Sequence, residues 1–137
     1  REVNKPLIIH TREAREDTIK ILQEENADEV GGVMHCFTET WEMAQAALEL
    51  GFYISFSGIV TFKNATELKE VAKKVPIERM LIETDSPYLA PVPFRGKPNV
   101  PQYVSKVAEH IADLRETSVE EIAQQTSDNF KNLFKIN

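Results

Sequence analysis

The stretch Met80-Leu-Ile-Glu-Thr-Asp-Ser-Pro-Tyr-Leu89 joins an apolar run of strand type to two carboxylates and a proline. Two other short apolar runs have the same form and lead into His10 and His35. The C-terminal ends of parallel strands lie together on one face of an α/β sheet or barrel, where active sites form. Because imidazole and carboxylate are usual ligands of Zn²⁺, Mn²⁺ and similar ions, this pattern indicates a hydrolytic metal site formed by His10, His35 and Asp85.

Each of these histidines taken alone would more often serve the fold, by bonding a backbone carbonyl. Two of them at matching strand ends, with Asp85 at a third, favour a metal site. Glu83 and Asp85 are two residues apart and share one face of a strand, where two carboxylates repel each other unless a cation or an arginine lies nearby. We interpret Asp85 as the ligand or proton acceptor, and Glu83 as a residue that pairs with a basic group and supports the ligands.

Apolar periodicity alternates between strand and helix along the chain. The patterns predict strands over residues 7–9, 30–36, 52–57 and 79–83, with helices over 14–25, 42–50, 64–75 and 101–114. Asn64 and Ser118, each followed by a glutamate three residues later, predict capping boxes, and residues 128–134 predict a last short helix. A complete (β/α)8 barrel needs about 200 residues or more. The 137 residues therefore predict about half a barrel, or a small open sheet.

Composition narrows the functional classes. The net charge of −6 argues against broad coating of nucleic acid, which needs a basic face, but permits a local grip on a few phosphates. Cys36 is the single cysteine, which excludes an internal disulfide and favours a reducing, cytoplasmic compartment. No apolar stretch approaches the ~20 residues of a membrane helix. The chain begins at Arg1 and enters a strand almost at once, so we expect it to be part of something longer.

The segment 84–100 is predicted as a long loop that holds four prolines. Loops above about 12–15 residues are usually functional or disordered, and the prolines make this one stiff, which favours function. Arg95 in this loop, and Arg12 two residues after His10, are candidates to bind substrate because a guanidinium offers a planar fork suited to phosphate oxygens. The alternative is that each is a solvated surface charge.

Five segments, taken in order, carry a family resemblance. They are Ile9-His10-Thr11-Arg12, Met34-His35-Cys36-Phe37-Thr38, Phe56-Ser57-Gly58, Glu83-Thr84-Asp85-Ser86-Pro87-Tyr88-Leu89 and Asn129-Phe130-x-x-Leu133-Phe134. Together they resemble the TatD family of metal-dependent deoxyribonucleases over nearly the whole chain.

The resemblance implies an α/β fold, a TIM (β/α)8 barrel of the metal-dependent hydrolase type, with two divalent ions (Mg²⁺, Mn²⁺ or Zn²⁺) at its C-terminal face. Matched motif to motif, His10 and His35 fall on the family's later histidine ligands, and Asp85 falls on its final, catalytic aspartate. The family's early His-x-His pair and its middle glutamate motif are absent. Residues 1–137 are therefore expected to be the C-terminal half of such a domain, strands five to eight.

The family is associated with 3′-to-5′ trimming of DNA, which implies an exonuclease acting on single-stranded DNA ends. Two alternatives stay open: a related hydrolase of amides, esters or lactones, and a non-catalytic half-barrel. A half-barrel leaves two strand edges open, so the expected partner is the missing N-terminal half or a second copy of the chain, and not a membrane.

Overall fold

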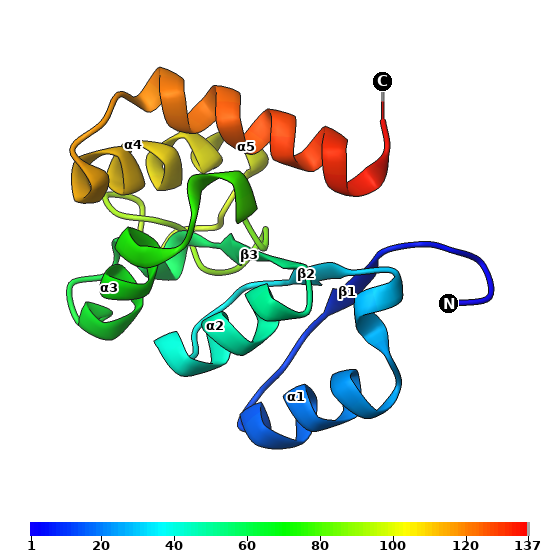
Figure 1. Ribbon diagram of the computed structural model, residues 1–137. Coiled ribbons are helices and arrows are strands. Elements are labelled where there is room, and N and C mark those ends of the chain that lie inside the picture. The colour runs from blue at the N-terminus through cyan, green and yellow to red at the C-terminus, as the bar shows by residue number, and fades with distance from the viewer. Residues whose placement is uncertain (137) are drawn as a thin grey trace.

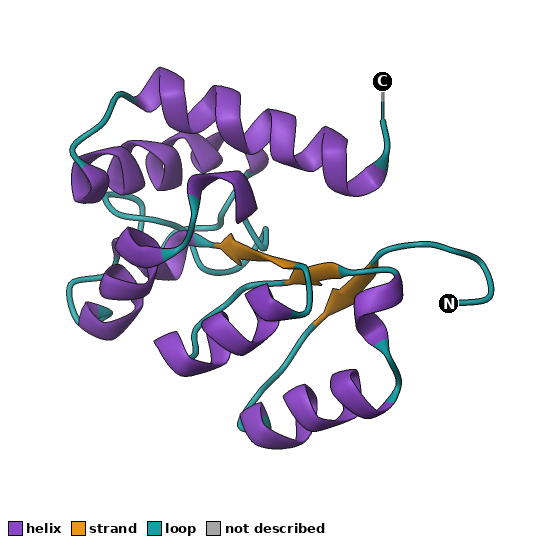
Figure 2. Ribbon diagram, viewed as in Figure 1, coloured by secondary structure: helices purple, strands orange, loops and turns teal. Residues whose placement is uncertain are grey.

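The fold is a four-stranded parallel sheet, described over residues 1–136 in a computed structural model. The strands lie side by side in chain order: β1 (Leu7–Ile9), β2 (Gly32–Met34), β3 (Phe52–Phe56) and β4 (Met80–Ile82). Every neighbouring pair is parallel. Strands are orange and helices purple in Figure 2. The predicted α/β class is confirmed, and the arrangement is that of part of a (β/α)8 barrel. The second strand is shorter than the predicted 30–36.

Each strand is followed by helical structure. The helices are α1 (Arg15–Glu24), α2 (Trp41–Glu49), α3 (Thr66–Lys74), α4 (Val104–Arg115) and α5 (Val119–Phe134). Short 3-10 turns separate several of them: η1 (Ala27–Glu29), η2 (Gly58–Thr61), η3 (Ile77–Arg79) and η4 (Pro101–Tyr103). Within residues 1–136, no helix combines the length and the apolarity needed to cross a membrane.

The two predicted capping boxes have different outcomes. The Ser118 hydroxyl accepts the Glu121 backbone N–H at 3.1 Å and begins α5, which confirms the second box. The first box is wrong, because α3 begins after Ala65 without a side-chain cap. The separate last helix is also wrong, since α5 continues unbroken through residues 128–134. Nothing in that segment interrupts a helix, and its Asn129 and Leu133 continue the buried stripe of α5.

The two faces of the sheet pack into different clusters. One face presents Phe52, Ile54 and Phe56 of β3 to the main core, which α1 to α4 and Ile122 of α5 complete. The other face presents Val33, Tyr53 and Leu81 to a smaller cluster with the end of α5. Figure 1 shows α1 and α2 on one side of the sheet and α5 on the opposite side. We call the face beneath α5 the inner face, since it corresponds to the interior of a barrel.

Asn129 fastens α5 to the sheet. Its side chain is 1% exposed, and its Nδ2 donates to the carbonyls of Ile77 at 2.7 Å and Met80 at 2.8 Å. The first carbonyl lies in η3 and the second at the first residue of β4, so the amide ties the last helix to the strand that leads into Glu83 and Asp85.

We predict that Asn129→Ala lowers the free energy of unfolding by roughly 2–4 kcal/mol, because two backbone carbonyls lose their donor in a buried setting. Urea unfolding of the full-length protein measures the change. Asn132→Ala, on the exposed side of the same helix, is the control and should change stability by less than about 0.5 kcal/mol. Equal losses in the two variants would contradict a fastening role for Asn129.

Candidate metal centre

The candidate site lies at the C-terminal ends of the strands, where the hydrogen bonds between neighbouring strands continue for one residue beyond them. The His35 N–H donates to the Ile9 carbonyl at 2.8 Å, and the Glu83 N–H donates to the Phe56 carbonyl at 3.0 Å. Side chains alternate between faces along a strand, so His35 follows Val33, and Glu83 follows Leu81, onto the inner face. A cavity of about 170 Å³ on this face is lined by both His35 and Glu83.

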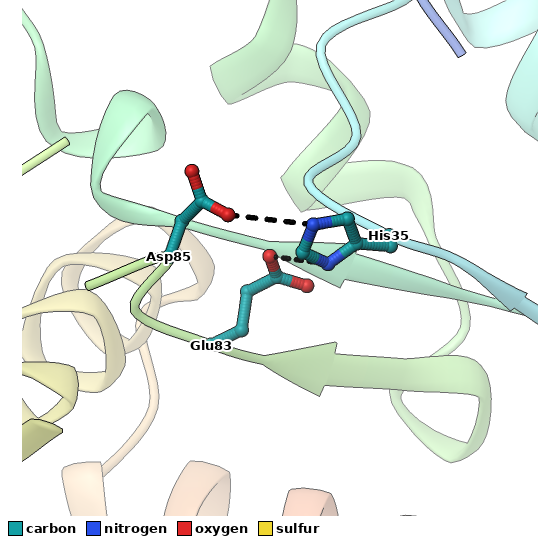
Figure 3. A group of neighbouring side chains, drawn as sticks. All are labelled: His35, Glu83 and Asp85. Carbon is teal, nitrogen blue, oxygen red and sulfur yellow. Dashed lines mark ion pairs between the residues drawn. The ribbon is translucent and has the colours of Figure 1, made fainter. Parts of the chain in front are cut away.

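Three potential ligands converge here. His35 Nδ1 lies 2.8 Å from Glu83 Oε1, and His35 Nε2 lies 3.4 Å from Asp85 Oδ1 (Figure 3). One ligand atom from each residue falls within 4.8 Å of the others, and all three residues are partly buried. Imidazole with two carboxylates is a donor set that suits a divalent transition-metal ion.

Glu83 provides the sharpest test of whether the residues fit a cation. Its Oε2 accepts the Cys36 backbone N–H at 3.1 Å. Its Oε1 is buried and has no hydrogen-bond partner among the described residues, although His35 Nδ1 is close. The short N···O approach therefore lacks hydrogen-bond geometry. A cation held between the Glu83 carboxylate and the His35 ring would satisfy this oxygen, and the donor set fits one.

His10 lies next to this group. Its ring centroid is 5.9 Å from that of His35, with the ring planes tilted by 47°. His10 itself is exposed, and the group of three closely spaced ligands does not include it. The structure thus brings His10, His35 and Asp85 to the same end of the sheet, as the sequence predicts. It also places Glu83 among the potential ligands, where the sequence interpretation gave it only a supporting role.

The two arginines occupy different settings. Arg12 is exposed in the turn between β1 and α1 and makes no ion pair within residues 1–136. Arg95 holds its guanidinium 3.9 Å from the ring centroid of Phe62, a cation–π contact. Neither arginine touches the His35 group.

Backbone conformation around the site is unusual. Cys36 has φ 48° and Asp85 has φ 60°, a left-handed region that residues other than glycine seldom adopt. Such positions concentrate at functional sites, where the surrounding structure enforces them. The Cys36 thiol donates to Ser57 Oγ at 3.4 Å. Burial raises the pKa of this thiol, against the lowering effect of Ser57 and with further raising by Glu83 and Asp85, so it is protonated at neutral pH.

Comparisons with known proteins agree with one another. The TatD related DNase family profile matches residues 1–135. The chain is 61% identical over 136 residues to the uncharacterized metal-dependent hydrolase YcfH of Escherichia coli K12, covering 99% of this chain and 51% of YcfH. It is 57% identical over 137 residues to the uncharacterized metal-dependent hydrolase YabD of Bacillus subtilis, covering 100% of this chain and 54% of YabD.

Among solved structures, the TatD homolog YJJV of Escherichia coli K12 superposes with a TM-score of 0.88 at 30% identity, covering 96% of this chain and 51% of that one. The chain therefore spans about half the length of the relatives that it matches.

We predict that Glu83→Gln weakens binding of Mn²⁺ or Zn²⁺ by at least about tenfold, because a carboxylate ligand becomes a neutral amide. Isothermal titration calorimetry on the full-length protein measures the affinity. The metal-induced gain in unfolding free energy should fall by about 1.4 kcal/mol for each tenfold loss at saturating ion. Glu67→Gln, an exposed change on α3, is the control, and matching affinities in both variants would remove Glu83 from the ligand set.

Proposed function

Because the chain belongs to the TatD-related DNase family, we propose that it forms part of a metal-dependent hydrolase that cleaves phosphodiester bonds of DNA. The observation that carries the proposal is the convergence of His35, Glu83 and Asp85 on one point, with a Glu83 oxygen left unbonded. Trimming of single-stranded DNA from its 3′ end is the specific activity that we propose.

In this proposal His10, His35 and Asp85 hold two divalent ions (Mg²⁺, Mn²⁺ or Zn²⁺) together with ligands from outside the chain, and Glu83 adds a carboxylate. When bound, such ions supply positive charge against the negative charge that grows on the phosphoryl oxygens. Asp85 accepts the proton of the attacking water as general base. The ladder bonds of the sheet and the enforced backbone at Asp85 hold these groups in place before substrate arrives.

Arg12 and Arg95 are proposed to bind substrate phosphates. A guanidinium binds phosphate oxygens through two parallel N–H groups, and Arg12 has no competing ion pair within residues 1–136. Arg95 likewise makes no ion pair within residues 1–136, and its guanidinium lies over the Phe62 ring. Two such contacts would bind substrate phosphates locally, and the overall net charge of −6 does not prevent this binding.

We further propose that the chain is the C-terminal half of the barrel domain, strands five to eight, and that its partner is the N-terminal half. β1 and β4 are the two outer strands of the sheet, and each has one unpaired edge. Such edges favour pairing with further strands, either from the other half or from a second copy. The single cysteine supports a reducing, cytoplasmic compartment.

We predict that Asp85→Asn in the full-length protein preserves the fold and lowers turnover on single-stranded DNA by at least about 10³-fold. The amide keeps the size of the carboxylate, yet it is a poor ligand and cannot accept the proton of water. Release of 3′ nucleotides at saturating Mg²⁺ or Mn²⁺ measures the rate, with circular dichroism as the check on folding. Asp28→Asn, an exposed change in η1, is the control. Turnover within tenfold of wild type would exclude Asp85 as the catalytic carboxylate.

We also predict that residues 1–137 alone release little or no nucleotide, because they supply only part of the ligand set that a two-ion site needs. The assay compares the isolated chain, the chain mixed with the upstream half, and the full-length protein on one 3′-labelled oligonucleotide. Activity should return on mixing. A fully active isolated chain would place the complete site within these residues.

A further inference from the structure

Resting on the proposed function, we propose that Tyr88 is the stacking platform for an unpaired nucleobase next to the scissile phosphate, and so helps select single-stranded ends. The Tyr88 N–H donates to the Asp85 carbonyl at 3.0 Å, which closes a turn that begins at Asp85. A turn of this kind keeps its first and last Cα atoms within about 7 Å. The residue lies one turn away from the proposed catalytic carboxylate.

The backbone that carries Tyr88 is held rigidly. Asn99 is 3% exposed, and its Nδ2 donates to the carbonyls of Thr84 at 2.7 Å and Tyr88 at 2.8 Å. The Asn99 N–H donates to the Pro87 carbonyl at 2.9 Å. One buried residue thus brackets the turn from Thr84 to Tyr88. Few degrees of freedom remain to be lost when a ligand binds this turn, which favours affinity.

The far side of the same loop is anchored to η2. The Val92 N–H donates to Thr61 Oγ1 at 2.9 Å. Gly58 approaches the Leu89 carbonyl so closely that a Cβ on Gly58 would lie 2.0 Å from that oxygen. The loop therefore cannot fold inward to bury Tyr88 without breaking these contacts.

The side chain of Tyr88 lies largely in solvent. The residue is 71% exposed, compared with 49% for the exposed aromatic residue Phe130. Phe94 stacks on Tyr103 at 4.0 Å and Phe130 packs on Phe134 at 4.8 Å, whereas Tyr88 has no ring partner within residues 1–136. A large exposed ring on a fixed loop is a surface suited to a flat partner.

The proposed DNA substrate offers a nucleobase as that partner. With a net charge of −6, the chain offers little long-range attraction to a polyanion. Proteins that bind single strands add base–aromatic stacking to their phosphate contacts, and the stacking tolerates any sequence because every base has a π face. A base that is paired inside a duplex has no free face, so stacking on Tyr88 selects unpaired ends.

The test compares two single-stranded oligonucleotides in the full-length protein, one ending in a normal 3′ nucleotide and one ending in an abasic 3′ nucleotide. The measured quantity is the ratio of kcat/KM for the normal end to kcat/KM for the abasic end. Wild type should favour the normal end, and Tyr88→Ala should reduce the ratio by about tenfold. Tyr88→Phe, which keeps the ring, and Val92→Ala, at a 47% exposed apolar residue of the same loop, should keep the ratio.

Other outcomes overturn the proposal in distinguishable ways. An unchanged ratio in an otherwise active Tyr88→Ala enzyme rules out stacking while leaving phosphodiester hydrolysis in place. An equal loss on both ends, together with a lower melting temperature, shows that another part of the protein covers Tyr88. A wild-type enzyme that releases nucleotides from neither oligonucleotide refutes the proposed function itself, and the stacking role with it.

Discussion

The hydrogen-bond ladder of the parallel sheet is the constraint on which the rest of the site depends. It continues one residue beyond the strands, from the Ile9 carbonyl to the His35 N–H and from the Phe56 carbonyl to the Glu83 N–H. Because side chains alternate in direction along each strand, these bonds fix both the height and the face of the two side chains. The apolar residues of β2 and β4, which directly precede His35 and Glu83, pack into the cores and hold the strands in place. The side chains of His35 and Glu83 are therefore held in fixed positions.

That placement has an energetic consequence. It holds the buried Glu83 oxygen without a hydrogen-bond partner among the described residues and enforces left-handed backbone at Cys36 and Asp85. Groups of this kind destabilise a protein unless the surrounding structure compensates. The compensation comes from the well-packed core on the opposite face and from Asn129 and Asn99, which tie α5 and the long loop to the sheet. The stable part of the fold thus maintains an unfavourable arrangement that a cation would relieve.

The sequence predicts this fold well where the signal is local. Short apolar runs set β1 and β3, and the Ser118 hydroxyl sets the start of α5, because each depends on neighbouring residues alone. Local sequence patterns do not predict contacts between residues that are far apart in the chain. The Asn64 side chain is of a type that often caps helices. The helix α3 nevertheless begins after Ala65, and no side chain caps it.

His110 illustrates the same limit. His110 lies outside the buried stripe of α4, and Lys69 of α3 lies with its Nζ 2.9 Å from His110 Nε2, a contact between residues 41 positions apart. Burial, and then the Lys69 charge, lower the pKa of His110 despite the opposing effect of Asp113, so the ring is neutral at pH 7 and can accept a hydrogen bond from the Lys69 ammonium. Likewise, a Glu83 oxygen faces His35 only because β4 pairs with β3, which in turn pairs with β2.

The inner face links completion of the core to completion of the site. Ile8 on this face is 66% exposed, while Val33, Tyr53 and Leu81 are buried in a cluster with Leu133 of α5. The same face carries His35 and Glu83 at its C-terminal edge. Strands that add to the open edges of β1 and β4 in the proposed barrel would cover the exposed apolar residues and bring further ligands to His10 in one step. Burial of apolar surface would then stabilise the same assembly that brings the ligands together. In this proposal, association of the sheet with further strands is favourable, and the sheet alone holds only part of the ligand set.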